Sequence, residues 1–493
     1  MVYLDFARFL KSNSIILLSI AVFLLASFFF FPKFYSATDE HEYLKNSVLL
    51  QQGSIAVKDI FSACRSGIFS EKGYISTYPI GESLFLVPFT WLGSLDLVMA
   101  SGMFLHLLNF LILILILRHL GIRKEFAMLY LFFPAFLWAS RTLYPHLLVL
   151  ATFLTGAYFY LGKNKSSWII SGFSFALAYL IRQDSIIGII AFGLPLLFLD
   201  KKKFVYFIAG ALPFIAIIPF LNLLLYGSPI AVQAGYFSFW QGISPIDVVL
   251  YALLLMAFYP LLLISPLFLL KKNKELFWAI VLTLPYLVIA ASMGIFDFEF
   301  SIETLLTARM RYLIPVIGLL LIPYSIMLSG FFEKLEKFSG LLNSRNLFVA
   351  MLLVFSVSTL VASYKHAEFI NNYRYSVFES INANIPENAL AIGSSDDEMY
   401  FIRGFFSNKK YLSIDLNQCL AGNPEKISIS SFIGEKPYLI MLYYPYQEGR
   451  DAPRQGTVNK ERQKMADFIN ANKENLELVY GSEKLNLSIY KFR

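Results

Sequence analysis

Long apolar segments without charged residues recur along this chain, and they constrain its fold more than any other feature. The first, from Ile15 to Phe31, is seventeen residues without a charge. The whole sequence is 57% hydrophobic and only 15% charged, whereas about 25% is usual for a soluble domain. A run of about 17–25 apolar residues is long enough to cross a bilayer as a helix. The sequence therefore predicts a mainly α-helical polytopic membrane protein.

The loops between these segments set the expected orientation of the helices. Alternate loops hold sixteen Lys and Arg residues on one side and four on the other. Short basic loops stay in the cytoplasm, so we expect a cytoplasmic N-terminus and, after an odd number of crossings, an extracytoplasmic C-terminus. Most of the net charge of +7 belongs to these loops and does not indicate nucleic acid. The eleven predicted transmembrane helices cover residues 13–31, 97–117, 126–140, 146–162, 167–181, 185–199, 204–225, 248–270, 276–293, 312–329 and 346–363.

Residues 79–93 are the ambiguous part of this topology. The segment follows Tyr78 and is apolar enough for a short span. Counting it as a span would invert every later loop and place the lysine-rich loops outside. We therefore expect an interfacial or re-entrant segment within a first outer loop of residues 32–96.

The composition changes near residue 365, which predicts a second domain. Residues 366–493 are richer in charged and polar side chains and contain no long apolar segment. A small extracytoplasmic α/β domain is expected there, after a transmembrane catalytic domain of residues 1–365. Its acidic group Asp396-Asp397-Glu398 fits a solvated loop first, and a contact to an acceptor or an ion second. Strand-like segments cover Leu390–Gly393, Lys410–Ile414, Tyr438–Tyr444, Leu476–Val479 and Leu485–Tyr490, and a helical pattern covers Lys460–Asn472.

The predicted topology gathers the unusual charged residues on the outer face. Asp39, Glu40 and Glu42 place three carboxylates within four residues, just after the first helix. Charge so close to the bilayer is costly and marks a functional candidate. A carboxylate base, together with arginines that bind an anionic leaving group, suits a group-transfer reaction. The other candidates on this face are Tyr78, Arg141, Tyr144, His146, Arg182, Asp184, Arg309 and Arg311.

Each of these candidates could also have a purely structural role. What favours a functional site is that all of them are predicted on the same side of the membrane. The alternatives are a solvated loop for Asp39-Glu40, a helix cap for His146, an ion pair of Arg182 with Asp184, and headgroup anchors for Arg309 and Arg311.

The order of these motifs resembles the GT-C glycosyltransferases, an integral-membrane class that includes protein O-mannosyltransferases and lipid A aminoarabinose transferases. The resemblance covers about residues 10–365 and implies sugar transfer, with inversion, from a polyprenyl-phosphate donor. The acceptor would be a protein, a lipid or a glycan at the extracytoplasmic face of the cell membrane. The motifs in order are Asp39-Glu40, Tyr78-Pro79-x-Gly81, Arg182, and Arg311-Tyr312-x-x-Pro315.

The resemblance also implies roles for individual residues. Asp39 would act as the base toward the acceptor hydroxyl, with Glu40 assisting. Arg311, with Arg309 or Arg182, would hold the lipid phosphate that leaves. We expect the substrate-binding set to be completed by Tyr78, Arg141, His146 and Asp184. The chain departs from the family pattern at Ile80, where a second proline is common, and at Glu82, where many relatives are neutral or basic.

The need for a metal stays open in this interpretation. A divalent ion, Mg²⁺ or Mn²⁺, would be held by Asp39 with His146. Some members of the class have a further acidic residue where this chain has Tyr144-Pro145-His146, and this departure weighs against a metal-dependent mechanism.

Two other classes of function stay open. One is a transporter or lipid flippase, which the position of the charges at helix ends and the lack of an internal repeat disfavour. The other is a non-enzymatic assembly or sensor protein whose outer domain binds a partner. The sequence does not determine the sugar, the acceptor, the oligomeric state, or whether Cys64 pairs with Cys419.

Overall fold

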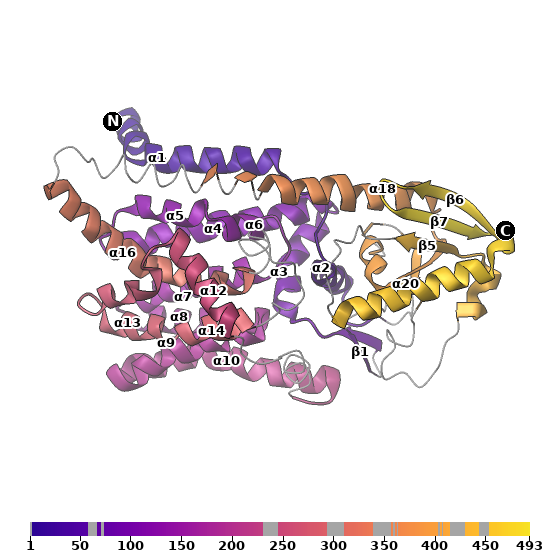
Figure 1. Ribbon diagram of the computed structural model, residues 1–493. Helices are drawn as coiled ribbons and strands as arrows, with labels where there is room; N and C mark the ends of the chain where they lie inside the picture. Colours follow the sequence, from indigo (N-terminus) through magenta and orange to yellow (C-terminus); the bar gives the residue numbers. More distant parts are fainter. Residues whose placement is uncertain are drawn as a thin grey trace.

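The computed structural model describes residues 2–57, 67–70, 73–229, 245–292, 310–338, 356–357, 360–361, 363–402, 405–406, 408–414, 429–442 and 453–493. A helix bundle occupies one end of the molecule and a small unit with a β-sheet occupies the other (Figure 1). The longer helices of the bundle are α1 (Val2–Phe29), α4 (Leu95–His119), α7 (His146–Tyr160), α8 (Lys165–Ile181), α9 (Ile186–Leu199), α10 (Lys201–Tyr226), α12 (Pro245–Phe258) and α16 (Ile314–Phe338). The shorter ones are η1 (Lys124–Ala127), α5 (Met128–Leu131), α6 (Pro134–Ala139), η2 (Gln183–Ser185), η3 (Leu262–Leu269), α13 (Lys274–Val281), α14 (Leu284–Ser292) and η5 (Met310–Leu313).

The bundle has the features of an integral membrane protein. Within the described residues, three helices are long and apolar enough to cross a membrane: Leu95–His119, Lys201–Tyr226 and Met310–Leu335. The bent pair Val248–Phe258 and Leu262–Leu269 makes a fourth if it counts as one span. Large apolar side chains such as Phe28 and Phe198 stay exposed on the helices, as expected where lipid replaces water. The predicted number of eleven spans is not confirmed.

Three of the predicted spans are interrupted. Residues 126–140 form η1, α5 and α6 instead of one helix, and the break precedes Pro134, which has no amide hydrogen to continue a helix. The predicted span 248–270 bends by 72° at a break, where Leu261 has a positive φ of 68°. Residues 276–293 divide between α13 and α14.

The last predicted span, residues 346–363, lies almost wholly outside the described residues. Cys64 and Cys419 also lie outside them, so their pairing stays a question.

The ambiguous segment after Tyr78 forms the short helix α3 (Ile80–Trp91). Its 12 residues extend about 18 Å, which is shorter than the hydrocarbon core of about 30 Å. It packs against α2 (Thr38–Gln51), α4 and α8. A Cβ atom on Gly81 would lie 2.7 Å from the Ile181 Cα atom, so glycine is what lets α3 approach the end of α8. The length of α3 agrees with a segment that does not span.

The C-terminal unit is built on a five-stranded mixed sheet in the order β4-β3-β5-β7-β6. β3 pairs in parallel with β4 and β5, and β7 pairs antiparallel with β5 and β6. All five strands and the helix that the sequence predicts are present. They are β3 (Leu390–Gly393), β4 (Lys410–Ser413), β5 (Tyr438–Leu442), β6 (Leu476–Ser482), β7 (Leu487–Phe492) and α20 (Pro453–Ala471), with α18 (Tyr375–Asn384) before them. A separate hairpin pairs β1 (Gly67–Ser70) with β2 (Gly73–Ser76).

A second apolar core joins this unit to the chain that follows α1. The ring of Phe34 stacks on Tyr35 at 4.2 Å and on Tyr400 at 5.7 Å, and it lies 5.0 Å from Phe378. Asn371 accepts a hydrogen bond from the Lys33 amide at 2.8 Å, which ties the end of α1 to the helical turn before α18. The C-terminal unit therefore packs directly on the segment that carries the acidic motif.

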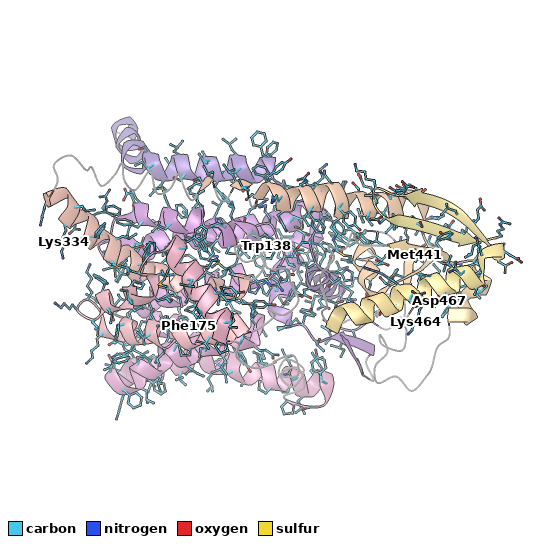
Figure 2. The ribbon with its side chains drawn as sticks, in the orientation of Figure 1. Trp138, Phe175, Lys334, Met441, Lys464 and Asp467 are labelled. Atoms are coloured by element: carbon cyan, nitrogen blue, oxygen red, sulfur yellow. The ribbon has the colours of Figure 1, made fainter. Side chains whose placement is uncertain are left out.

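One lysine-rich segment, at the C-terminal end of α16, lies at the end of the molecule opposite the C-terminal unit (Figure 1). Figure 2 shows Lys334 at the end of the bundle far from Met441 and Lys464. Two of the predicted lysine-rich loops meet, because Lys203 forms an ion pair of 2.8 Å with Glu275. Lys334 and helix α2, which carries the acidic motif, thus lie at different ends of the bundle (Figures 1 and 2).

Candidate active site

Asp39 lies in the first turn of α2 and is fixed by a tyrosine. The Tyr78 hydroxyl donates a hydrogen bond of 2.7 Å to the Asp39 Oδ1 atom. The ring of Tyr78 in turn packs edge-on against Tyr43, with centroids 5.2 Å apart. Asp39 is half-buried, and it lies at a helix N-terminus, where the helix dipole favours a negative charge. The motifs Asp39-Glu40 and Tyr78-Pro79-x-Gly81 therefore meet in space.

Glu40 is fully buried and holds two chain segments together. Its Oε1 atom accepts from the Ser36 amide at 2.9 Å and from the Ala37 amide at 3.1 Å. Its Oε2 atom accepts from the Leu143 amide at 2.7 Å. Burial raises the pKa of Glu40, and these hydrogen bonds oppose that rise. Glu40 thus connects the start of α2 to the turn at residues 140–145.

Arg311 stands at the entry of α16, in the turn η5. Pro315 follows within the first turn of α16, where its missing amide hydrogen costs nothing. The Arg311 guanidinium lies 4.3 Å from the ring of Tyr144 and 4.9 Å from that of Tyr312, and it donates to the Tyr312 hydroxyl at 2.9 Å. Its Nε atom is buried without a hydrogen-bond partner. Among the residues that the structure describes, no carboxylate forms an ion pair with Arg311.

Tyr144 packs against the Arg311 guanidinium and is close enough to Asp39 to be affected by its charge. Burial raises the pKa of the Tyr144 phenol; the Arg311 charge lowers it, and the charges of Asp39 and Glu40 raise it. Asp39 and Arg311 therefore act on the same side chain from nearby positions. The phenol stays protonated, so the main charges of this region are the Asp39 carboxylate and the Arg311 guanidinium.

Arg182 directly follows α8, has an extended backbone and forms an ion pair with Asp184. Its Nε atom lies 2.9 Å from the Asp184 Oδ1 atom, and a second contact of the same fork reaches Oδ2. The Tyr286 hydroxyl donates to Asp184 at 2.6 Å. The Arg182 guanidinium also lies 5.3 Å from the ring of Tyr312, which it shares with Arg311. The ion pair expected as an alternative is present, and it borders the Arg311 region.

His146 is in hydrogen-bond contact with Arg182. Its Nδ1 atom lies 2.7 Å from the Arg182 Nη1 atom, and its ring lies 5.4 Å from that of Tyr312. A guanidinium in hydrogen-bond contact repels a divalent cation and uses the lone pair that a metal needs. In the described part of the chain, the group of His, Asp and Glu side chains close enough to share a metal is His41, Glu42 and Glu398.

Arg141 contacts a different set of atoms. Its Nη1 atom donates to the Ser363 carbonyl at 2.9 Å, and its Nη2 atom contacts the Ser363 hydroxyl. The side chain is 3% exposed and joins the turn after α6 to the helical segment before α18. Arg309 lies outside the described residues.

The expectation that Asp396-Asp397-Glu398 forms a solvated loop is wrong for its last two residues. Asp397 and Glu398 are each 1% exposed. Asp397 accepts hydrogen bonds from Ser394, and Glu398 accepts one from Lys45, which lies 353 positions away in the chain. No local sequence pattern separates a solvated acid from one that is paired over such a distance, and Lys45 itself was missed.

Among the residues that the structure describes, Glu82 is a buried acid without an ion-pair partner. It is 2% exposed, and its Oε2 atom has no hydrogen-bond partner. Burial raises the pKa of Glu82 to about 8. The side chain is therefore mostly protonated at neutral pH, which explains how an acid is tolerated in this apolar segment.

Stability should fall as the pH rises toward 8, because of Glu82. Its pKa in the folded state is above the unfolded value, so the folded state is favoured most below about pH 4.5 and loses stability up to about pH 8. The loss amounts to about 3 kcal/mol at pH 7. Glu82→Gln should flatten the dependence of the melting temperature on pH between 5 and 8, measured in detergent. An unchanged slope would mean that Glu82 stays ionised.

Comparisons with known proteins show a similarity of fold. No protein-family model and no curated protein matches the sequence. The structure is similar to ArnT from Cupriavidus metallidurans bound to undecaprenyl phosphate, with 11% identity, a TM-score of 0.62, and 97% of this chain and 98% of that chain covered. Apo ArnT gives 13% identity, a TM-score of 0.61 and 98% of each chain. The apo oligosaccharyltransferase from Archaeoglobus fulgidus gives 12% identity, a TM-score of 0.54, and 82% of this chain and 64% of that chain.

These neighbours are GT-C glycosyltransferases, and the chain has their fold. The resemblance seen in the sequence motifs is thereby confirmed for the architecture. At 11–13% identity the likeness establishes the fold alone.

Proposed function

We propose that this chain is a glycosyltransferase that moves a sugar from a polyprenyl-phosphate donor to an acceptor at the extracytoplasmic membrane face. The observation that carries the proposal is that Asp39 and Arg311 lie near enough for their charges to interact, and that Arg311 packs on Tyr144. One group is a carboxylate held by Tyr78, and the other is a buried guanidinium without a described carboxylate partner. A base and an anion receptor are the two functions that this transfer needs.

The reaction displaces phosphate from the anomeric carbon. The acceptor hydroxyl attacks that carbon from the face opposite the phosphate, and its proton passes to Asp39. The bond between the anomeric carbon and the phosphate oxygen breaks, and the oxygen keeps the electron pair. Attack from the opposite face inverts the configuration. Arg311 then stabilises the charge that develops on the leaving polyprenyl phosphate.

Arg311 suits the phosphate better than Arg182 does. A planar guanidinium binds two phosphate oxygens at once, provided that it is not already neutralised. Arg182 is neutralised by Asp184 through two contacts. We assign Arg182, His146 and Asp184 a positioning role: they orient Tyr312, and Tyr312 in turn orients Arg311.

The lipid part of the donor requires an apolar path beside the carboxylate. A small, mainly apolar cavity is lined by Tyr78, Pro79, Tyr179, Asn222 and Tyr226, among others, between the start of α3 and helices α8 and α10. Tyr78 belongs both to this cavity and to the Asp39 contact. A prenyl chain near this cavity would place its phosphate close to the helix ends that carry the arginines.

The orientation and the division of the chain belong to the same proposal. We place the N-terminus in the cytoplasm, residues 1–365 in a membrane-embedded catalytic domain, and residues 366–493 in an extracytoplasmic domain. The separation of Lys334 from the acidic motif supports this orientation (Figures 1 and 2).

The geometry argues against the two other classes of function. A transporter binds near the middle of the membrane, whereas Asp39 and Arg311 lie at helix ends. A sensor whose outer domain works alone would not need that domain to pack on α2, as Glu398 does through Lys45.

A transfer assay tests the proposal. The purified chain in nanodiscs is incubated with a panel of labelled polyprenyl-phosphate sugars and membrane extract, and both the labelled product and the released polyprenyl phosphate are measured. We expect one donor to give both in equal amounts. Movement of a labelled substrate into proteoliposomes without bond cleavage would instead favour a transporter.

Removing the hydroxyl of Tyr78 should impair the base without removing it. Tyr78→Phe loses the 2.7 Å hydrogen bond to Asp39 and keeps the ring. Because small errors in position are costly in catalysis, we expect kcat to fall about 10-fold. Tyr43→Phe, which keeps the edge-on ring contact, is the matched control. Full kcat in Tyr78→Phe would show that Asp39 is oriented by other groups.

A further inference from the structure

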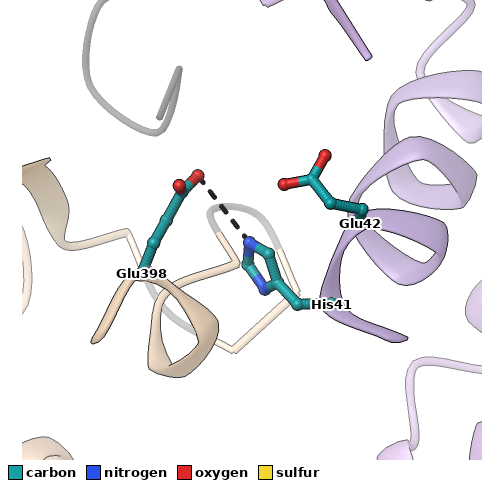
Figure 3. A group of neighbouring side chains, drawn as sticks. All are labelled: His41, Glu42 and Glu398. Atoms are coloured by element: carbon teal, nitrogen blue, oxygen red, sulfur yellow. Dashed lines mark ion pairs between the residues drawn. The ribbon is translucent and has the colours of Figure 1, made fainter. Parts of the chain in front are cut away.

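Three metal-type ligands face one another where α2 meets the C-terminal unit. His41 and Glu42 lie on α2, and Glu398 lies on the turn η7 (Ser395–Tyr400) (Figure 3). The His41 Nε2 and Glu398 Oε1 atoms are 3.7 Å apart, and one ligand atom from each of the three side chains lies within 4.8 Å of the others. Judged by donor type alone, this His-Glu-Glu group fits a divalent metal.

The cation of this group is the ammonium of Lys45. The Lys45 Nζ atom lies 2.7 Å from the Glu42 Oε1 atom and 3.1 Å from the Glu398 Oε1 atom. The side chains of Lys45, Glu42 and Glu398 are 10%, 1% and 2% exposed. Burial lowers the pKa of Lys45, but Glu398 and Glu42 outweigh it and raise that pKa above its ordinary value. Lys45 therefore stays charged where a metal would otherwise sit.

The first turns of α2 are tied to three other parts of the molecule. Asp39 is bonded to Tyr78 and Glu40 to Leu143. One turn later, Glu42 accepts from the Ser76 hydroxyl at 3.3 Å, and Lys45 reaches Glu398. The last of these ties connects α2 to the C-terminal unit by charge, and His41 on α2 contacts the same Glu398 carboxylate.

The apolar core at the same junction does not need this ion pair for adhesion. Phe34, Tyr35, Leu44, Tyr400 and Ile440 belong to one buried cluster that already joins the two parts. Apolar burial is not directional, whereas a buried ion pair allows few arrangements because an unpaired charge there is costly. The charged contact is therefore suited to setting the orientation of α2 and not the strength of docking.

We propose that the Lys45–Glu398 ion pair positions Asp39 by fixing α2 against the C-terminal unit, so that both are positioning residues of the transfer reaction. The statement about the reaction rests on the proposed function. The statement about the orientation of α2 does not.

Glu398→Gln is the sharpest variant because it leaves the Lys45 ammonium with a carboxylate partner, while it also removes the contact of Glu398 with His41. Lys45 keeps Glu42 as its partner at 2.7 Å. Lys45→Met, in contrast, leaves two buried carboxylates without their cation, and such a change destabilises a fold strongly. Glu387→Gln is the matched control, because Glu387 pairs with Lys409 at 2.9 Å wholly inside the C-terminal unit.

The test combines kinetics with hydrogen exchange on the full-length chain. In Glu398→Gln we expect kcat to fall at least about 10-fold, with KM for the donor changed by less than about 2-fold, because position and not donor binding is lost. Amides of α2 should exchange faster, while the melting temperature stays near the wild-type value. Glu387→Gln should change none of these quantities, and Lys45→Arg should keep most of kcat.

Three results would overturn the inference. One is wild-type kcat and wild-type exchange in Glu398→Gln. A second is an equal loss of kcat in Glu387→Gln. A third is binding of one Zn²⁺ per wild-type chain that is lost in Glu398→Gln, because the group would then hold a metal in place of Lys45. If the wild-type chain transfers no sugar, the proposed function fails, and the exchange of α2 still decides whether the ion pair orients that helix.

Discussion

Asp39→Asn should lower kcat about 10³-fold and leave the fold intact. The asparagine keeps the shape of the side chain and an oxygen that accepts from Tyr78, but it cannot take a proton from the acceptor hydroxyl. General-base catalysis contributes about 10²–10⁴-fold, which sets the size of the effect. Initial rates of transfer from the polyprenyl-phosphate sugar measure it, and the melting temperature checks the fold.

Asp96→Asn is the matched control for this variant. Asp96 lies in the first turn of α4 and is exposed. Its replacement should leave kcat unchanged. Glu40→Gln should differ from both, because Glu40 accepts hydrogen bonds at both oxygens and its loss loosens the contact to Leu143. Full activity in Asp39→Asn and Glu40→Gln together would remove the basis of the proposed mechanism.

Arg311→Met should lower kcat about 10²–10³-fold and raise KM for the donor. The methionine preserves packing against Tyr144 and Tyr312, but it removes the positive charge that meets the leaving phosphate. Loss of one preorganised electrostatic contact in a buried site typically has an effect of about this size. The measurement is kcat and KM for the donor, together with the inhibition constant of free polyprenyl phosphate, which should rise.

The charge and the geometry of Arg311 can be separated experimentally. Arg311→Lys keeps the charge and loses the two-pronged contact, so it should recover part of kcat. Arg123→Met, at the opposite end of the bundle and with a side chain that is 47% exposed, should have no effect. If Arg311→Met bound polyprenyl phosphate as tightly as the wild type, the phosphate would have to be held elsewhere, for example by Arg182.

The elements of the C-terminal unit were predictable because each is defined locally. The predicted strand Leu390–Gly393 is β3. The predicted strand Tyr438–Tyr444 begins at the same residue as β5, which covers Tyr438–Leu442. A short apolar run between turn residues is a local signal. The order of the strands was not predictable, because pairing between β3 and β5 depends on contacts across the whole domain.

The positions of the bundle helices along the chain were predicted correctly, but the breaks within them were not. Hydropathy reports how apolar a segment is, and it identified residues 97–117 and 204–225 within α4 and α10. It does not report where a helix breaks. Pro134 interrupts one predicted span, and the bend near Leu261 interrupts another. The break before Pro134 is buried among neighbouring helices, where backbone groups find other partners, whereas Leu261 at the bend is exposed.

The sequence by itself determined the mainly helical, apolar character of this chain, and it predicted basic loops on one side of a membrane and an acidic motif on the other. Composition and spacing are local properties, so they are visible without a structure. The tertiary structure alone decided which charges are neutralised. Arg182 and Arg311 look equivalent in the sequence, yet Arg182 is paired with Asp184, whereas no described carboxylate pairs with Arg311. Glu398 looks like a solvated acid, yet it is buried against Lys45. Electrostatic roles depend on distances of a few ångströms between residues far apart in the chain, and only the folded molecule sets those distances.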